Sequence, residues 1–188
     1  MPTTKLLSQD ETGEVSPHDY GDYFFLQPFG DAQRLVIGPS LAHLQLMSRL
    51  ATRCLAPPYR LVYVLLTEQA GYQPGRYQSP NINTVDELRE FLMGCLTFLE
   101  SDARHHFWIG SADGTAVLVY DQHNVLFAYG PLQCLMTELF MADFRPGEFI
   151  FPSPHAHTIS PKFDPDMERL LSQYEWEYAP LEEEDLWD

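Results

Sequence analysis

The 188-residue sequence lacks most of the motifs that assign a function directly. It has only three cysteines, Cys54, Cys95 and Cys134, and no CxxC pair, which argues against a zinc knuckle or a dithiol redox couple. It has no GxxxxGK[ST] motif, no GxGxxG motif and no GxSxG motif. Phosphate-cradling loops and the serine nucleophile elbow are therefore not indicated.

Long apolar runs are also missing. No run approaches the ~20 residues that span a bilayer, so we expect no membrane partner. The first residues, MPTTKLLSQDETGEV, do not combine a basic region with an apolar stretch, as a secretory signal would. Because the cysteines are odd in number and widely spaced, we expect them to be reduced and the protein to be cytoplasmic.

Basic residues are scarce. The chain has 11 Lys and Arg against 27 Asp and Glu, a net charge of −16. The excess of acids lies at the ends, because residues 1–22 carry −4, residues 23–163 carry −3 and residues 164–188 carry −9. Nucleic acid is a poor partner for this chain, since phosphate affinity comes from Lys and Arg. A basic protein is the partner that the charge favours.

The length fits one domain, and the hydrophobic fraction of 45% is typical of a globular protein. We expect a flexible acidic arm over residues 1–21, a single globular domain over 22–179 and an acidic C-terminal tail over 180–188. No internal repeat is present, and the sequence leaves the oligomeric state open.

The hydrophobic periodicity predicts an α+β fold with a mixed, mainly antiparallel sheet packed by three to four amphipathic helices. Helical stripes cover residues 39–56, 84–102 and 131–144, with a short helix beginning at Asp164. Predicted strands cover residues 22–29, 33–38, 59–67 and 148–151, with a last alternating segment, EWEY, near the C-terminus. We expect the apolar strand 59–67 in the middle of the sheet and a long loop over residues 68–82.

Residues 105–129 predict a three-stranded antiparallel meander. Asp113-Gly114 favours a two-residue type I′ turn, and a three-residue turn at 122–124 needs Asn124 in the left-handed region. The first turn sets the cross-strand partners: Trp108 with Val119, Phe107 with Tyr120, and His106 with Asp121.

Three groups of residues could carry catalytic or metal chemistry. If His106 pairs with Asp121, the carboxylate would raise the imidazole pKa, which suits acid–base catalysis, although a polar cross-strand pair explains the same residues. His155 and His157 lie two apart, so a strand would place both rings on one face for a metal. His123 or Asp121 could supply a further ligand, and local hydrogen bonding is the alternative. Cys134, in the first turn of a helix, is a candidate nucleophile or a packing residue.

Surface recognition is the other possibility. Tyr72, Arg76 and Tyr77, in the predicted loop, are residue types enriched at binding hot spots. The tail carries further candidates for partner binding: Glu182, Glu183, Glu184, Asp185 and Trp187. An ordinary solvated loop and a solubilising tail are the alternatives.

We expect a noncatalytic intracellular binding protein without a cofactor, whose acidic surface engages a basic partner. In composition the chain resembles immunity or antitoxin proteins that neutralise a basic toxin. Two alternatives remain open. One is a small enzyme that uses a metal or the His106–Asp121 pair, and the other is a subunit of a larger assembly.

Overall fold

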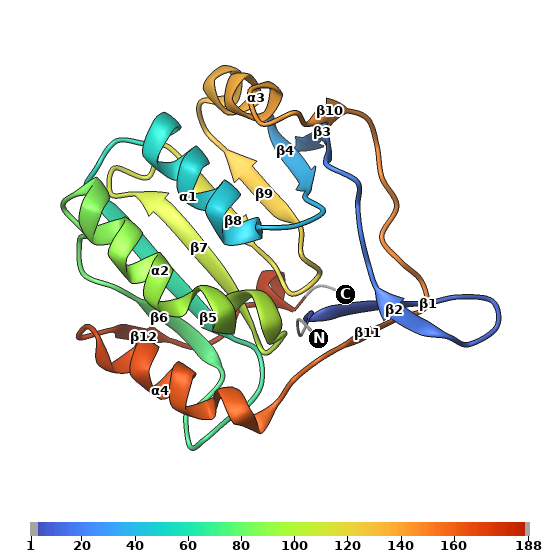
Figure 1. The fold of residues 1–188 in the computed structure, drawn as a ribbon. Helices are drawn as coiled ribbons and strands as arrows, with labels where there is room; N and C mark the ends of the chain where they lie inside the picture. Colours follow the sequence, from blue (N-terminus) through green and yellow to red (C-terminus); the bar gives the residue numbers. More distant parts are fainter. Residues whose placement is uncertain (1–3, 187–188) are drawn as a thin grey trace.

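The computed structural model describes residues 4–186, which form two sheets and four helices (Figure 1). The predicted α+β class with a mainly antiparallel sheet is confirmed. Within the described part of the chain, no helix combines the length and apolarity needed to cross a membrane.

The large sheet has nine strands in the order β10-β3-β4-β9-β8-β7-β5-β6-β12. Its strands are β3 (Tyr23–Phe29), β4 (Ala32–Gly38), β5 (Tyr59–Leu65), β6 (Gly75–Gln78), β7 (His105–Ser111), β8 (Val117–Tyr120), β9 (Leu126–Tyr129), β10 (Arg145–Pro146) and β12 (Glu177–Ala179). Neighbouring strands are antiparallel except for β10 and β3, which are parallel.

The four helices cover one face of this sheet (Figure 1). They are α1 (His43–Cys54), α2 (Val85–Ser101), α3 (Leu132–Phe140) and α4 (Asp164–Ser172). Because side chains alternate along a strand, Leu35 and Leu118 pack in the cluster that includes the helices, whereas Val36 and Val119 pack in a second cluster on the opposite face. Helix α2 begins as predicted, since the Glu87 N–H donates to the Thr84 hydroxyl.

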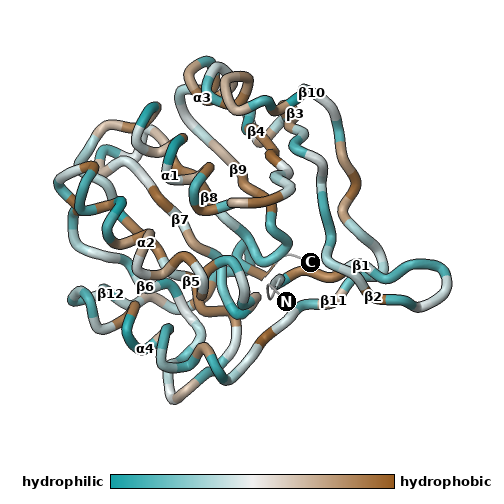
Figure 2. Tube along the Cα trace, in the orientation of Figure 1, coloured by the Kyte–Doolittle hydropathy of each residue, from teal (hydrophilic) through white to brown (hydrophobic). Residues whose placement is uncertain are grey.

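The small sheet has the order β11-β1-β2 and consists of β1 (Leu6–Gln9), β2 (Val15–Pro17) and β11 (His155–His157). Residues expected to form a loose arm therefore pair with a strand from the other end of the chain. The hydrophilic tip of the β1–β2 hairpin projects from the body (Figure 2), but Leu6 at its base is fully buried. Leu6 belongs to the same apolar cluster as Val125, which fixes this hairpin beside the β8–β9 turn.

The meander β7-β8-β9 has the predicted register, with Trp108 opposite Val119 and Phe107 opposite Tyr120. Asn124 is left-handed at φ 62°, as predicted. The first turn differs from type I′, because the Gly114 N–H donates to the Ser111 carbonyl and Asp113 has no positive φ. The register survives since Ser111 still donates to Ala116 across the longer loop.

Three other strand predictions need correction. Strand β5 lies inside the sheet but two places from its centre, which β8 occupies. Residues 68–82 are not only loop, since they contain β6, which pairs with β5 and β12. Residues 148–151 do not form a strand, and the ladder with β3 is made by Arg145–Pro146 instead.

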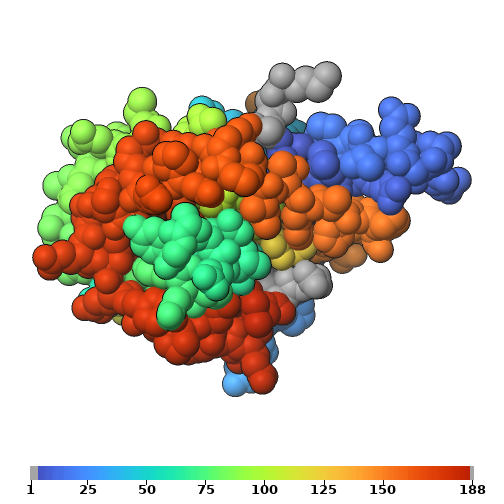
Figure 3. Space-filling view, turned by 90° about the horizontal axis from the view of Figure 1, so that it is seen from below, coloured from blue at the N-terminus to red at the C-terminus, as the bar shows by residue number. Residues whose placement is uncertain are grey.

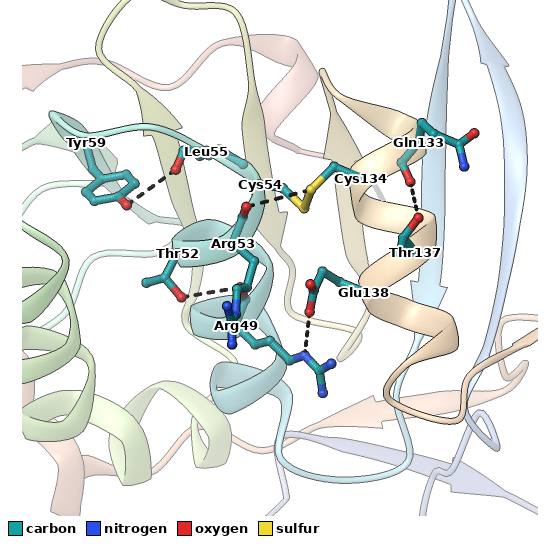
Figure 4. The surroundings of a disulfide bond; sticks show 10 residues. All are labelled: Arg49, Thr52, Arg53, Cys54, Leu55, Tyr59, Gln133, Cys134, Thr137 and Glu138. Carbon is teal, nitrogen blue, oxygen red and sulfur yellow. Dashed lines mark hydrogen bonds and ion pairs between the residues drawn. A yellow bond between two sulfur atoms is a disulfide. The ribbon is translucent and has the colours of Figure 1, made fainter.

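The expectation of reduced cysteines is wrong for two of the three. Cys54, at the end of α1, and Cys134, in the first turn of α3, form a disulfide with a Cα–Cα distance of 5.7 Å (Figure 4). Arg49 and Glu138 join the same two helices by an ion pair of 2.9 Å. Cys95 is free and buried. Because stable disulfides are typical of oxidising compartments, the cysteine count no longer supports a cytoplasmic location.

Replacing both Cys54 and Cys134 with serine should lower the free energy of unfolding by about 2–4 kcal/mol, because the cross-link restricts the unfolded chain. Urea denaturation of the wild type and the double variant, each with and without dithiothreitol, measures this. Dithiothreitol should shift the wild-type midpoint toward that of the variant and leave the variant unchanged. Equal midpoints, insensitive to the reductant, would show that the bond does not form.

Candidate metal centre

Three histidines from distant parts of the chain converge where the small sheet meets the large one. They are His123, in the β8–β9 turn, and His155 and His157, in β11, and one ring nitrogen of each lies within 4.8 Å of those of the other two. The ring centroids are separated by 5.2 Å for His123 and His155, 4.8 Å for His123 and His157, and 5.0 Å for His155 and His157.

The two sheets create this convergence. Residues 155–157 are extended because they pair with β1, so His155 and His157 point to the same side of the strand. Leu6 of β1 and Val125, two residues after His123, belong to one apolar cluster, which holds β11 near the β8–β9 turn. His155–His157 is a strand, so both rings lie on one face, and the third group that joins them is His123 rather than Asp121.

The buried carboxylate of Asp121 orients His123. One oxygen, Oδ2, lies 2.8 Å from Nδ1 of His123, and the other, Oδ1, accepts the backbone N–H groups of His123 and Val125 at 2.9 and 2.8 Å. Burial would raise the pKa of Asp121, but the hydrogen bond and charge of His123 hold this pKa below its ordinary value. An ionised Asp121 accepts a hydrogen bond from Nδ1–H of His123, which keeps the proton on Nδ1 and leaves the Nε2 lone pair for a metal.

The rings of His155 and His157 each also have a nitrogen that could bind a metal. Nδ1 of His155 lies 3.0 Å from the Pro152 carbonyl, which fixes the proton on Nδ1 and leaves Nε2 as a lone pair. Nε2 of His157 is buried and has no hydrogen-bond partner among the described residues. Burial, together with the neighbouring His123 and His155, lowers the pKa of His157 to about 4, so this ring is neutral at pH 7.

These features are typical of a metal site. A neutral imidazole is a common zinc ligand at about 2.0–2.1 Å, and tetrahedral coordination at that distance places ligand atoms ~3.3 Å apart. The observed spread of 4.8 Å is wider, so metal binding would require the rings to close by about 1.5 Å. His155, which is exposed, has room to move. Three protein ligands leave a fourth position open, as in catalytic rather than structural zinc sites.

The predicted His106–Asp121 acid–base pair is not what the structure shows. The Gln122 N–H donates to Nδ1 of His106 at 3.2 Å, and Nε2 lies 3.1 Å from the Asp185 carbonyl. Burial lowers the pKa of His106 to about 4 and outweighs the opposing charge of Asp121, so the expected rise is wrong. Asp121 orients His123 instead, and His106 connects the meander to the C-terminal segment.

Cys134 is not available as a nucleophile, because its sulfur is bonded to Cys54. The predicted helix position is correct, but a disulfide sulfur offers no thiolate.

The residues assigned to partner binding divide into two sets. Arg76, in β6, makes a bidentate ion pair with Asp185, which is only 2% exposed, and reaches Glu182 at 2.8 Å. Figure 3 shows the C-terminal segment lying beside the residues around position 75. Arg76 and Asp185 therefore bind each other and anchor part of the tail to the sheet.

The second set is partly or fully exposed. Tyr77 lies 6.5 Å from Tyr72 and 5.4 Å from Tyr178, measured between ring centroids, and the three rings form a small tyrosine cluster. Glu183 and Glu184 are exposed beside the anchored Asp185. Trp187 lies outside the described residues.

Sequence reasoning missed a buried cation near the centre. Lys5 is fully buried, its Nζ lies 3.5 Å from the centroid of the Tyr120 ring, and it has no hydrogen-bond partner among residues 4–186. Burial, opposed in part by Asp121, Glu100 and Asp102, lowers the pKa of Lys5 to about 7. No local pattern marks this residue, since its burial depends on how β1 packs.

No protein-family model, no curated protein and no solved structure matches the chain. The chemistry of the residues is therefore the basis for proposing a function.

Lys5→Met should raise the free energy of unfolding at pH 7 by about 2–5 kcal/mol, because each pKa unit corresponds to about 1.4 kcal/mol. The pKa of Lys5 is lower in the folded state than in the unfolded state. The unfolded chain therefore binds more protons between pH 7 and 10.5, and wild-type stability should rise over that range. Denaturant titrations at pH 7 and 9.5 measure both effects.

The exposed Lys162, the other lysine of the chain, provides the control. Lys162→Met should leave the stability within about 0.5 kcal/mol of wild type, as for most surface substitutions. Either of two results would contradict a destabilising burial of the Lys5 ammonium group: a loss of stability in Lys5→Met, or a wild-type stability that does not rise with pH.

Proposed function

We propose that this protein binds a divalent transition metal ion, with Zn²⁺ as the best fit, through His123, His155 and His157. The observation that carries the proposal is the convergence of the three imidazoles, since one ring nitrogen of each lies within 4.8 Å of those of the other two. The buried, unpartnered Nε2 of His157 supports it, because buried polar atoms in proteins almost always have a partner.

The chemistry of the ligands narrows the choice of ion. Imidazole suits Zn²⁺, Cu²⁺, Ni²⁺ and Fe²⁺, whereas Mg²⁺ and Ca²⁺ prefer oxygen ligands. The Asp121–His123 hydrogen bond matches the carboxylate–histidine pairs that support metal ligands in other proteins, where the carboxylate fixes the tautomer and raises the basicity of the ring.

An open coordination position favours chemistry over a purely structural role. A metal ion with three histidine ligands can polarise a bound carbonyl or phosphoryl group, or lower the pKa of a bound water toward 7. His123 also lines a pocket of about 190 Å³ on the face of the large sheet opposite the helices. The function that this arrangement supports best is therefore a metal-dependent enzyme acting on a small molecule.

A second proposal is binding of a basic protein, as the net charge of −16 favours. The tyrosine cluster of Tyr72, Tyr77 and Tyr178 supplies aromatic anchors of the kind found in interfaces, and Glu183 and Glu184 are exposed acids. An immunity or antitoxin role stays a hypothesis from composition.

Zinc titration tests the first proposal. The wild-type protein should bind one Zn²⁺ per chain in calorimetry, and the same ratio should appear in elemental analysis after gel filtration. His155→Ala and His157→Ala should each weaken binding at least about tenfold, since each removes one ligand. His18→Ala is the matched control, because its half-buried ring lies outside the cluster and should not affect zinc affinity.

Saturating Zn²⁺ should also stabilise the wild type, by about 2.7 kcal/mol at a hundredfold excess over Kd. Substoichiometric zinc, or equal affinity in the wild type and both ligand variants, would overturn the metal proposal.

The second proposal concerns kinetics. A basic protein that binds this chain should associate more slowly as ionic strength rises, since salt screens the attraction between exposed charges. Tyr178→Ala should speed dissociation in surface plasmon resonance, and Glu183→Gln with Glu184→Gln should slow association. A salt-independent association rate would contradict the role of the acidic surface.

A further inference from the structure

A separate cleft lies between the β1–β2 hairpin, the start of α1 and the second half of α2. Its volume is about 350 Å³, within the range of roughly 300–1,000 Å³ that small-molecule sites occupy. Thr4 and His18 come from the two ends of the hairpin. His43 begins α1, and Glu100 lies in the last turn of α2. None of the three histidines proposed as metal ligands lines this cleft.

Glu100 is the only Asp, Glu, Lys or Arg among the described residues that line the cleft. Its side chain is half-buried and makes no ion pair within residues 4–186. Oε1 accepts the Leu44 N–H at 2.7 Å and so caps α1, because Ala42 at the N-cap position has no side-chain acceptor. Oε2 accepts no hydrogen bond from the described part of the chain, so half of the carboxylate is left for a ligand.

The charge of Glu100 is incompletely compensated within the protein. Burial raises the pKa of its carboxyl, and the Leu44 N–H and the charge of Lys5 offset this effect only in part. The Nζ of Lys5 lies over the Tyr120 ring and has no hydrogen-bond partner among the described residues, so it forms no pair with Glu100. A cation in the cleft would therefore stabilise the ionised carboxylate.

Two imidazole rings add hydrogen-bonding groups to the wall without adding positive charge. Burial lowers the pKa of His43 to about 3 and that of His18 below its ordinary value, so both rings are neutral at pH 7. Nε2 of His18 has no hydrogen-bond partner among residues 4–186. A neutral imidazole offers one lone pair, and an ammonium group has three N–H donors and no acceptor.

The remaining wall includes apolar side chains from three elements. They are Pro17 of the hairpin, Leu41 in the β4–α1 loop and Leu96 of α2. Leu41 is 79% exposed, so a ligand that covers it would remove apolar surface from water.

We infer that this cleft binds a small primary amine, held as its ammonium ion by Glu100, with His18 as a further hydrogen-bond partner and an apolar body against Leu41 and Leu96. An anion in the same place would lie against an unpaired carboxylate. The net charge of −16 also attracts cations to the protein. The inference requires no metal ion and goes beyond the proposed metal centre.

Three probes of similar shape and different charge test the inference: phenethylamine, 2-phenylethanol and phenylacetate. Calorimetry at pH 7 on protein treated with a chelator should show phenethylamine binding at least about tenfold more tightly than the other two, because only its ammonium group makes a charge-assisted hydrogen bond to Glu100. Equal or tighter binding of phenylacetate would overturn the inference, since the N-terminus of α1 and Lys5 would then dominate the cleft.

Glu100→Gln tests the carboxylate, because the amide keeps an acceptor for the Leu44 N–H and removes the charge. It should lower phenethylamine affinity at least about tenfold and leave 2-phenylethanol affinity unchanged. Glu90→Gln is the matched control, since it removes the same charge from an exposed position on α2 and should leave phenethylamine affinity unchanged. Equal losses in the two variants would overturn the inference.

Two further variants keep the test decisive if Glu100→Gln is poorly folded. Leu41→Ser changes an exposed side chain and should weaken binding of phenethylamine and 2-phenylethanol alike. His18→Ala should weaken phenethylamine binding and leave zinc affinity unchanged. Unchanged phenethylamine affinity in both variants would overturn the inference.

The outcomes for the two sites are independent. Zinc binding without phenethylamine binding would overturn this inference and leave the metal centre standing. Phenethylamine binding without zinc binding would support the cleft and overturn the metal proposal alone.

Discussion

The buried carboxylate of Asp121 is the interaction on which the candidate centre depends. Its Oδ1 accepts two backbone N–H groups that close the β8–β9 turn, and its Oδ2 holds the His123 ring in one tautomer. A buried charge is costly unless it is fully hydrogen-bonded. The turn provides those bonds, so the same contacts that satisfy the carboxylate also aim His123 at β11.

The candidate centre also requires β1, near the N-terminus, to pair with β11 at residues 155–157. Strand β11 pairs with β1 over Leu6 to Ser8, and Leu6 is buried against the large sheet. This pairing places His155 and His157 on one side of an extended strand beside His123. The small sheet therefore holds the two candidate ligands of β11 at strand spacing, with both rings on the same side. A bound ion would join the small sheet to the large one and stabilise their contact.

The parts of the fold that could be predicted from sequence are set by local patterns. The meander register follows from turn position, Asn124 adopts the left-handed conformation its side chain tolerates, and Thr84 caps α2. Strand β6 was missed because four residues in a polar stretch give no periodic signal, and only pairing with β5 and β12 makes them a strand. The Cys54–Cys134 bond spans a sequence separation of 80, which no local pattern specifies.

The candidate site likewise depends partly on local sequence spacing and partly on contacts between segments far apart in sequence. The HxH spacing of His155 and His157 predicted a shared face, but the third ring depends on packing between segments far apart in sequence. The β7–β8 pairing ends at Phe107 and Tyr120, and the register that predicted His106 opposite Asp121 does not decide which imidazole the carboxylate binds. The geometry of the β8–β9 turn places His123, not His106, in hydrogen-bonding distance of Asp121. Burial also lowers the pKa of His106, whereas the nearby charge of Asp121 predicted a rise.

X-ray absorption at the zinc edge tests the central claim most directly. In the zinc-loaded protein it should show nitrogen or oxygen neighbours at about 2.0–2.1 Å with the multiple scattering of about three imidazole rings, and no sulfur at about 2.3 Å. A first shell of sulfur, or of oxygen without imidazole scattering, would contradict the coordination of a metal ion by His123, His155 and His157.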